Sequence, residues 1–369
     1  MFIFLFQCNE YHKKEISGDI CYSLCHEKSF ELKHCIDNDP YIKRFGLYSQ
    51  PFHTGHIQIN SETCLFQTFL IQDNLVVRVP VSVLHPETDI KLPHGLTVEQ
   101  FSDLGRNYFN SILGYSHHQD LINRLLQFAD FNGNQELSLG EVQSVWRLIN
   151  NREFLLLFLF HKQSSVPNIN GTCGSLYRFE YHPKNYLYHS NKSGFLSAIF
   201  TNSYRWGFPS LHKRLKIAVG LLELVIDLSE TEGFPFFLCN IDSNLFGYTE
   251  KYELLLQNMS ELKSAQMLKN IFANRTCVSD GDCQYSSQCR SLCDNATRKC
   301  SSQILNTPLY YVCDILREYI LIGETGHYYY DLKHYLEKCI QVSPNMVEFS
   351  AYMNEFHAFL WDFIKNDAK

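Results

Sequence analysis

The sequence predicts an α+β fold, bilobal or split into two domains, with disulfide-rich segments near both ends. Of its 369 residues, 45% are apolar and 14% aromatic, so the chain can bury a large core. The stretch from Tyr41 to Pro93 is rich in β-branched and aromatic residues, which indicates a small antiparallel sheet. Helical patterns dominate later, above all from Leu211 to Leu228. Most of the 14 cysteines lie near the two ends.

The charge pattern excludes two classes of partner. The net charge is −7, the isoelectric point is near 6.1, and no run of Lys or Arg occurs. Binding to a nucleic acid or to an anionic membrane surface requires a basic patch. We therefore expect neither of these and instead a protein partner, whose identity the sequence does not specify.

The cysteines and the glycosylation sequons indicate an oxidising, secretory compartment. The C-terminal cysteine segment contains no C-x-x-C pair and no neighbouring histidine, so disulfides are favoured over a zinc site. Its members are Cys277, Cys283, Cys289, Cys293 and Cys300. Because their number is odd, at least one must pair outside the segment. Sequons that accept glycans occur at Asn170, Asn191, Asn258, Asn274 and Asn295.

Cysteines also cluster in the first forty residues. Cys8, Cys21, Cys25 and Cys35 are close enough in sequence for two local bridges, although spacing does not decide the pairing. We expect a stapled cap without chemistry of its own. Further along, Cys313 and Cys339 fall in a region of about three predicted helices after Thr307, where they could join these helices to one another or to the C-terminal segment.

Residues 119–150 have the pattern of a helix, a twelve-residue loop and a second helix. The loop from Asp130 to Glu141 reads D-F-N-G-N-Q-E-L-S-L-G-E and matches the ligand types of an EF-hand calcium loop. The expected ligands are Asp130, Asn132, Asn134, the carbonyl of Glu136, Ser138 or its water, and a bidentate Glu141.

Two features of this loop weaken the predicted site. Position six holds Gln135 where the sharp turn favours Gly, and a Gln with positive φ costs about 1 kcal/mol. Only Asp130 and Glu141 bring a formal charge to a divalent cation. Two interpretations stay open, a weak calcium site or a helix pair retained for packing alone.

The stretch from Gly233 to Met259 has the layout of a protein-kinase catalytic centre without its catalytic residues. In an active kinase, a loop carries a catalytic Asp, an Asn five residues later binds magnesium, and the following strand ends at a magnesium-binding Asp. This chain has Asn240, Leu245 and Asn258 at these positions. Asn240 has no useful basicity, Leu245 cannot bind a metal, and Asn258 offers a single neutral oxygen.

The flanking motifs carry a resemblance to a known family. The motifs LKIAVGLLELVIDL (215–228), FLC (237–239) and GYTEKYEL (247–254), with both cysteine-rich segments, resemble the first branch of the divergent protein kinase domain family, also called the family with sequence similarity 69. The resemblance implies a protein-kinase-like bilobal fold with an inserted EF-hand. It implies an N-terminal cysteine module over 1–40, an N-lobe over 41–185 with the EF-hand at 119–150, and a C-lobe over 186–369 that contains the cysteine-rich segment 277–300.

Two more kinase positions follow from the resemblance. Thr63, in the motif SETC, stands where the family has a lysine on its third strand, and no Lys occurs between Lys43 and Lys91. Glu153 matches the acid that pairs with this lysine in an active kinase. With the lysine missing, we expect Glu153 to be an acid on the surface of a helix that continues from the EF-hand.

These substitutions predict a non-catalytic pseudokinase of the secretory pathway with a scaffold or regulatory role. ATP and magnesium are not expected as cofactors, and calcium is the one cofactor that the loop is suited to bind. One alternative is an active lumenal kinase that uses rearranged residues such as Asp242. Another is a calcium-dependent adaptor.

The resemblance also implies a location. Members of this family lie in the lumen or the membrane of the endoplasmic reticulum, where a signal anchor gives a type II orientation. The first residues, MFIFLF, are only six apolar residues, which is too short for a signal peptide or a spanning helix. We therefore expect an anchor to precede this N-terminus.

Overall fold

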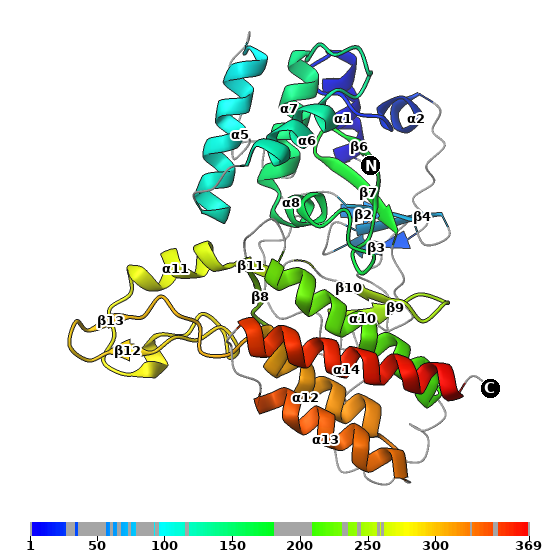
Figure 1. The fold of residues 1–369 in the computed structure, drawn as a ribbon. Coiled ribbons are helices and arrows are strands. Elements are labelled where there is room, and N and C mark those ends of the chain that lie inside the picture. The colour runs from blue at the N-terminus through cyan, green and yellow to red at the C-terminus, as the bar shows by residue number, and fades with distance from the viewer. Residues whose placement is uncertain are drawn as a thin grey trace. The chain divides into compact units, whose positions relative to one another are not determined.

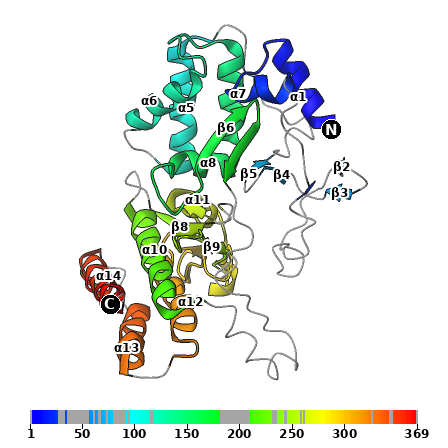
Figure 2. The same cartoon turned by 90° about the vertical axis from the view of Figure 1, so that its right-hand side faces the viewer.

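In the computed structural model, the chain forms two compact units (Figures 1 and 2). Unit 1 comprises Met1–Lys162 and Val166–His182, and unit 2 comprises Gln163–Ser165 and Pro183–Lys369. The described residues are 2–26, 34–35, 57–59, 62–64, 68–72, 75–78, 92, 96–114, 118–180, 209–230, 235–241, 245–256, 259, 262–324, 327–341 and 346–367. The predictions for Asn191, Asp242 and Asn258, and for the side chains of Cys35 and Thr63, lie outside what is described.

Unit 1 contains a five-stranded antiparallel sheet in the order β1–β4–β5–β7–β6. Its strands are β1 (His34–Cys35), β4 (Thr68–Gln72), β5 (Leu75–Arg78), β6 (Ile169–Cys173) and β7 (Leu176–Glu180). A separate hairpin pairs β2 (Ile57–Ile59) with β3 (Glu62–Cys64). The sheet predicted within residues 41–93 is therefore completed by two strands about a hundred residues further on. Pairing of β5 with β7 makes this long-range connection.

Within the described residues, four helices of unit 1 come between the two groups of strands: α5 (Val98–Leu113), α6 (Gln119–Ala129), α7 (Leu139–Asn150) and α8 (Arg152–Leu159). Figure 2 shows α5, α6 and α7 lying together. Every residue of α7 from Gly140 to Ile149 is buried, which makes this helix the centre of the unit.

The prediction that the helix after the twelve-residue loop continues through Glu153 is wrong. Asn151 leaves the helical conformation, with ψ at 114°, and its side chain accepts a hydrogen bond from the Phe154 amide at 3.1 Å. An N-cap Asn satisfies an amide that a new helix leaves unpaired. Asn151 therefore ends α7 and starts α8.

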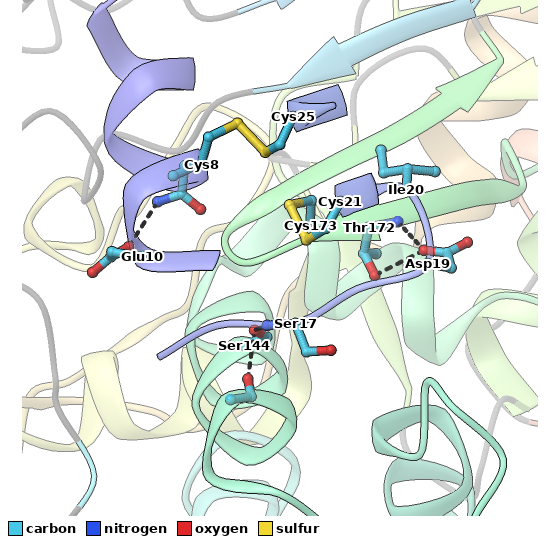
Figure 3. Close-up of a disulfide and its surroundings, with 12 residues drawn as sticks. Cys8, Glu10, Ser17, Asp19, Ile20, Cys21, Cys25, Ser144, Thr172 and Cys173 are labelled. Atoms are coloured by element: carbon cyan, nitrogen blue, oxygen red, sulfur yellow. Dashed lines mark hydrogen bonds between the residues drawn. A yellow bond between two sulfur atoms is a disulfide. The ribbon is translucent and has the colours of Figure 1, made fainter. Parts of the chain in front are cut away.

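The N-terminal segment comprises α1 (Phe2–His12) and α2 (Cys21–Cys25). Cys8 pairs locally with Cys25, but Cys21 pairs with Cys173 at the end of β6, 152 residues away (Figure 3). The expected second local bridge is thus wrong for Cys21. Both sulfur atoms of this long-range bond lie in a small apolar cluster with Ile16 and Ile20, and burial of this cluster brings the segment to the sheet.

Polar contacts hold the same segment in place. The Thr172 amide donates to Asp19 at 2.6 Å, and the Ser17 amide donates to the Ser144 hydroxyl on α7 at 2.8 Å (Figure 3). Gly18 is required here, because a Cβ atom at this position would lie 2.1 Å from the Thr172 carbonyl oxygen. The segment is therefore an integral part of unit 1 and contacts both its sheet and its central helix.

Unit 2 is mainly helical. Its helices are α10 (Leu211–Glu230), α11 (Ala265–Ala273), α12 (Pro308–Leu321), α13 (His327–Gln341) and α14 (Met346–Asp367). Figure 1 shows α12 and α14 alongside α10. The predicted helix at 211–228 is α10, and the buried Arg214 on it donates to the carbonyl oxygens of Tyr319 (2.7 Å) and Ile320 (2.9 Å). These carbonyls end α12, so the guanidinium group serves as its C-terminal cap.

Short strand pairs follow α10. β8 (Phe236–Leu238) pairs with β11 (Leu262–Ser264), and β9 (Phe246–Tyr248) pairs with β10 (Leu254–Leu256). Gly220 allows α10 to approach β10, because a Cβ atom there would lie 2.8 Å from that of Leu254. After α11 comes the cysteine-rich segment with its own pair, β12 (Cys293–Asp294) and β13 (Lys299–Cys300). Cys313 and Cys339 join α12 to α13, one of the two alternatives left open above.

Candidate functional site

The loop predicted to correspond to the kinase catalytic loop follows β8. Leu238 ends the strand, and the chain continues through Cys239, Asn240 and Ile241. Cys239 and Ile241 are buried, whereas Asn240 between them is exposed. An asparagine amide can donate and accept hydrogen bonds, but it cannot take a proton from a hydroxyl group as a catalytic carboxylate does.

Leu245 belongs to the apolar core of unit 2. Its side chain is 4% exposed, and the next residue, Phe246, is fully buried at the start of β9. Asn258 lies between β10 and the buried Met259, outside the described residues. A leucine packed in a core stabilises the fold through its apolar surface and offers no atom to a cation.

The cysteine-rich segment is oxidised throughout. Its bonds are Cys277–Cys293, Cys283–Cys300 and Cys239–Cys289. The odd fifth cysteine of the segment thus pairs with a residue of the loop after β8. Three sulfur atoms, those of Cys277, Cys283 and Cys293, lie within 4.8 Å of one another, but a metal requires thiolates and each of these sulfurs is in a disulfide.

Asp282 is one of two acids in this segment, with Asp294, whose pKa is lowered. The Asp282 carboxylate accepts hydrogen bonds from the backbone amides of Val278 and Ser279, both at 2.9 Å. These bonds favour the charged form and lower the pKa of Asp282 below its ordinary value. Its charge therefore closes a local turn next to Cys277.

Glu153 has a defined partner, contrary to the expected surface acid. It lies in the first turn of α8 and accepts a hydrogen bond from the Tyr177 hydroxyl at 2.9 Å. Tyr177 is fully buried on β7, so the bond connects the helix to the sheet. Sequence reasoning missed this contact because the two residues belong to different elements.

The sheet topology bears on which residue stands where an active kinase has the lysine of its third strand. Thr63 is in the β2–β3 hairpin, outside the five-stranded sheet. In chain order the third strand of that sheet is β5, which ends at Arg78. Arg78 pairs in register with Tyr177, the partner of Glu153. Thr63 was predicted to lie on the third strand from the short motif around it. The order of the strands in the sheet, however, depends on pairing between residues that are far apart in the sequence.

The loop between α6 and α7 is folded by its own side chains. Asp130 accepts from the amides of Asn134 (3.0 Å) and Gln135 (2.9 Å). Asn132 and Asn134 each accept from the amide two residues later. The loop places Gln135 at a φ of 65°, in the left-handed region that favours glycine. The strained turn expected from the sequence is present.

Glu141 closes the loop from the first turn of α7. Its side chain is 0% exposed, and its carboxylate accepts from the Ser138 amide and hydroxyl, both at 2.8 Å, and from the Asn132 side-chain amide at 2.8 Å. Ser138 and Glu141 form a capping box, which starts α7. Glu141 therefore has a structural role that does not depend on a metal.

These contacts test whether the loop suits a calcium ion. Hard oxygen atoms of Asp130, Asn134 and Glu141 come from one twelve-residue loop, and this is the donor type that calcium prefers. The nitrogen of the Asn132 amide, which cannot bind a cation, is turned toward Glu141. The residues fit calcium in donor type, although Asn132 would have to turn its amide for its oxygen to bind.

Three sequons lie among the described residues. Asn274 and Asn295 are exposed, at the end of α11 and in the turn between β12 and β13. Asn170 is half-buried on β6, and Thr172 of the same sequon is buried and bonded to Asp19.

Sequence reasoning left two disulfide partners unassigned. Cys173 ends β6 and Cys239 follows β8, each without a nearby cysteine to indicate a bridge. The sequence offered one signal for such a bridge: the number of cysteines in the C-terminal segment is odd, so one of them needs a partner outside the segment. Nothing in the sequence indicates that this partner lies next to Asn240.

Two family models match the chain. One is described as the protein-kinase domain of FAM69 and matches residues 145–342. The other is described as the N-terminal cysteine-rich ER region of FAM69 and matches residues 5–127. Within the described residues, no helix combines the length and the hydropathy that crossing a bilayer requires. The two matches cover most of this mixed helix-and-sheet chain with its several disulfides, and the protein belongs to the FAM69 family, an ER-associated family with a kinase-like domain.

Proposed function

We propose that this protein is a pseudokinase of the secretory pathway that acts as a scaffold or regulator without transferring phosphate. The observation that carries the proposal is Leu245, an apolar core residue at the position where a kinase needs a magnesium ligand. Asn240 adds to it, because an amide replaces the catalytic carboxylate. The loss of either group alone lowers phosphoryl transfer by orders of magnitude.

A thermal-shift measurement tests this proposal. We expect that ATP with magnesium or manganese will not raise the melting temperature of the purified chain, because the ligands for the metal–nucleotide complex are missing. A stabilisation of several degrees that is lost in Asp242→Ala would contradict the proposal and support the rival, an active kinase that uses rearranged residues.

One observation specifically favours this rival. Arg78, at the end of the third strand of the sheet, carries a positive charge on a strand that has no Lys. In an active kinase the third-strand cation binds the nucleotide phosphates. Arg78→Ala is therefore the second variant for the same measurement, and loss of an ATP-dependent shift in this variant would assign the phosphate contact to β5.

A calcium-dependent adaptor is a second candidate function, compatible with the first. Supporting it, the loop presents oxygen donors and leads directly into α7, the buried central helix of unit 1. Ion binding at Glu141 would therefore act on the first turn of a helix that the N-terminal segment contacts through Ser144. A change in this helix could alter a surface that binds a partner.

Calorimetry on three variants tests calcium binding. We expect the wild type to bind weakly, at about 10⁻⁴ to 10⁻³ M. Glu141→Gln should abolish binding, because it removes one of two ligand charges while a Gln still completes the capping box. Gln135→Gly should strengthen binding up to about fivefold, because glycine adopts positive φ without the steric cost.

Arg298→Gly is the matched control, since Arg298 also has positive φ, at 52°, but lies in the cysteine-rich segment. It should leave calcium binding unchanged. If the wild type shows no binding at millimolar calcium and Gln135→Gly does not rescue it, the loop is a structural remnant. The adaptor proposal would then fall, and the pseudokinase proposal would stand.

Location and modification complete the proposal. We place the protein in the lumen of the endoplasmic reticulum or, as the family resemblance implies, on its membrane in a type II orientation. Asn274 and Asn295 are the sequons whose exposure best suits glycan attachment. The family's ER association and the six described disulfides support an oxidising compartment.

A further inference from the structure

The cysteine-rich segment is bonded to Cys239, the residue just before Asn240. Cys239 is joined to Cys289 by a disulfide, and the two residues are 0% and 1% exposed. The Cys239 carbonyl oxygen also accepts a hydrogen bond from the Ser286 hydroxyl. One residue of the loop is thus held by both a covalent bond and a hydrogen bond.

The same segment binds the backbone just after Asn240. The Ile241 amide donates to the side-chain oxygen of Gln288, and the Gln288 side-chain amide donates to the Ile241 carbonyl oxygen at 2.8 Å. Gln288 therefore uses both polar groups of its amide on one residue, as a neighbouring strand would. Asn240 lies between two residues that are both fixed.

The turn of residues 285–289 has hydrogen bonds of its own. The Cys289 amide donates to the Ser286 hydroxyl at 3.0 Å, and the Tyr285 amide donates to the Cys289 carbonyl at 3.0 Å. The Gln288 carbonyl accepts a hydrogen bond from the hydroxyl of Tyr311 on α12 at 3.2 Å. The turn is thus hydrogen-bonded to α12, a long helix of unit 2, as well as to the loop.

We propose that Ser286–Cys289 is a built-in lock that keeps the loop around Asn240 in one conformation. In active kinases the catalytic site is controlled by an activation segment that becomes ordered or mobile. Here β11 leads through α11 into the cysteine-rich segment, and this segment is bonded to the loop. Because the Asn240 side chain stays exposed, the lock presents it to solvent in a fixed position. The comparison with kinases, but not the lock itself, rests on the proposed function.

Hydrogen–deuterium exchange on the oxidised, purified chain tests the lock. In the wild type the Ile241 amide should be protected. Gln288→Ala removes both hydrogen bonds to Ile241 and leaves the disulfide, and it should raise the exchange rate of this amide about tenfold. Gln303→Ala, an exposed glutamine after the same segment, is the control and should change nothing.

A second pair of variants tests the covalent part. In Cys239→Ala with Cys289→Ala, chymotrypsin should cut within residues 237–248 at least about tenfold faster than in the wild type, because the loop opens locally. Cys277→Ala with Cys293→Ala removes a disulfide of the same segment that forms no bond to Cys239, although it packs in the same apolar cluster. The cutting rate within residues 237–248 should therefore rise less than in the first pair.

Two results would overturn the lock. One is an Ile241 amide that exchanges in the wild type as fast as an unprotected amide. The other is an exchange rate that Gln288→Ala does not change. Neither result bears on nucleotide binding, which the ATP-dependent thermal shift measures separately, so failure of the lock and failure of the pseudokinase proposal are distinguishable.

Discussion

Replacing both Cys21 and Cys173 by alanine is expected to lower the free energy of unfolding of unit 1 by about 5 kcal/mol, the chain-entropy value for so long a loop. The bond joins residues 152 apart, and both are fully buried. Its loss frees the N-terminal segment from β6. The measurement is a urea titration under non-reducing conditions, followed by hydrogen exchange of the α7 amides.

The double variant Cys8→Ala with Cys25→Ala is the matched control. It also removes one disulfide of the N-terminal segment, but the closed loop spans only 17 residues. The same entropy argument gives about 3 kcal/mol for a loop of this size. An equal or larger loss in the control would show that loop length does not set the contribution of the Cys21–Cys173 bond.

A second large effect is expected from Glu10→Ala. Arg147 on α7 donates to both carboxylate oxygens of Glu10, at 2.9 and 3.1 Å, and both side chains are buried. Removing the acid leaves a buried guanidinium group without this counter-charge. Breaking a buried ion pair in this way typically costs about 3–5 kcal/mol. The same urea titration measures it.

Two further variants serve as comparisons for Glu10→Ala. Asp103→Ala removes the acid of an exposed ion pair with Arg106 on α5, and it should cost at most about 1 kcal/mol. The combined change Glu10→Leu with Arg147→Met should cost less than Glu10→Ala, because no charge remains buried. A Glu10→Ala variant as stable as Asp103→Ala would mean that the buried pair does not hold the N-terminal segment to α7.

The Ser286–Cys289 lock and the Cys21–Cys173 disulfide connect distant parts of the chain in the same way. In each, a disulfide joins a cysteine-rich segment to a distant part of the same unit: Cys21 to β6 in unit 1 and Cys289 to the loop after β8 in unit 2. The neighbouring backbone is then fixed by a hydrogen bond that the Thr172 amide donates to Asp19 and by one that Gln288 donates to the Ile241 carbonyl oxygen. The cysteine-rich segments of this chain therefore brace elements of the kinase-like domain.

Features with a short-range cause could be predicted from the sequence. The apolar spacing of residues 211–228 predicts α10, and the EF-hand-like ligand spacing predicts the loop of Asp130 and Glu141, including the positive φ of Gln135. These features depend on residues within one or two turns of each other. The family likewise could be recognised from contiguous motifs, and the two family models confirm it.

Features that join distant residues were decided by the tertiary structure alone. Cys21 forms its disulfide with Cys173 and not with a cysteine nearer in sequence. Glu153 accepts a hydrogen bond from Tyr177. The third strand of the sheet in chain order is β5 and not the segment around Thr63. In each case the sequence allows several partners of the same chemistry. Burial of the Ile16 and Ile20 cluster and the pairing of β5 with β7 select one partner, because only the packed chain brings it within bonding distance.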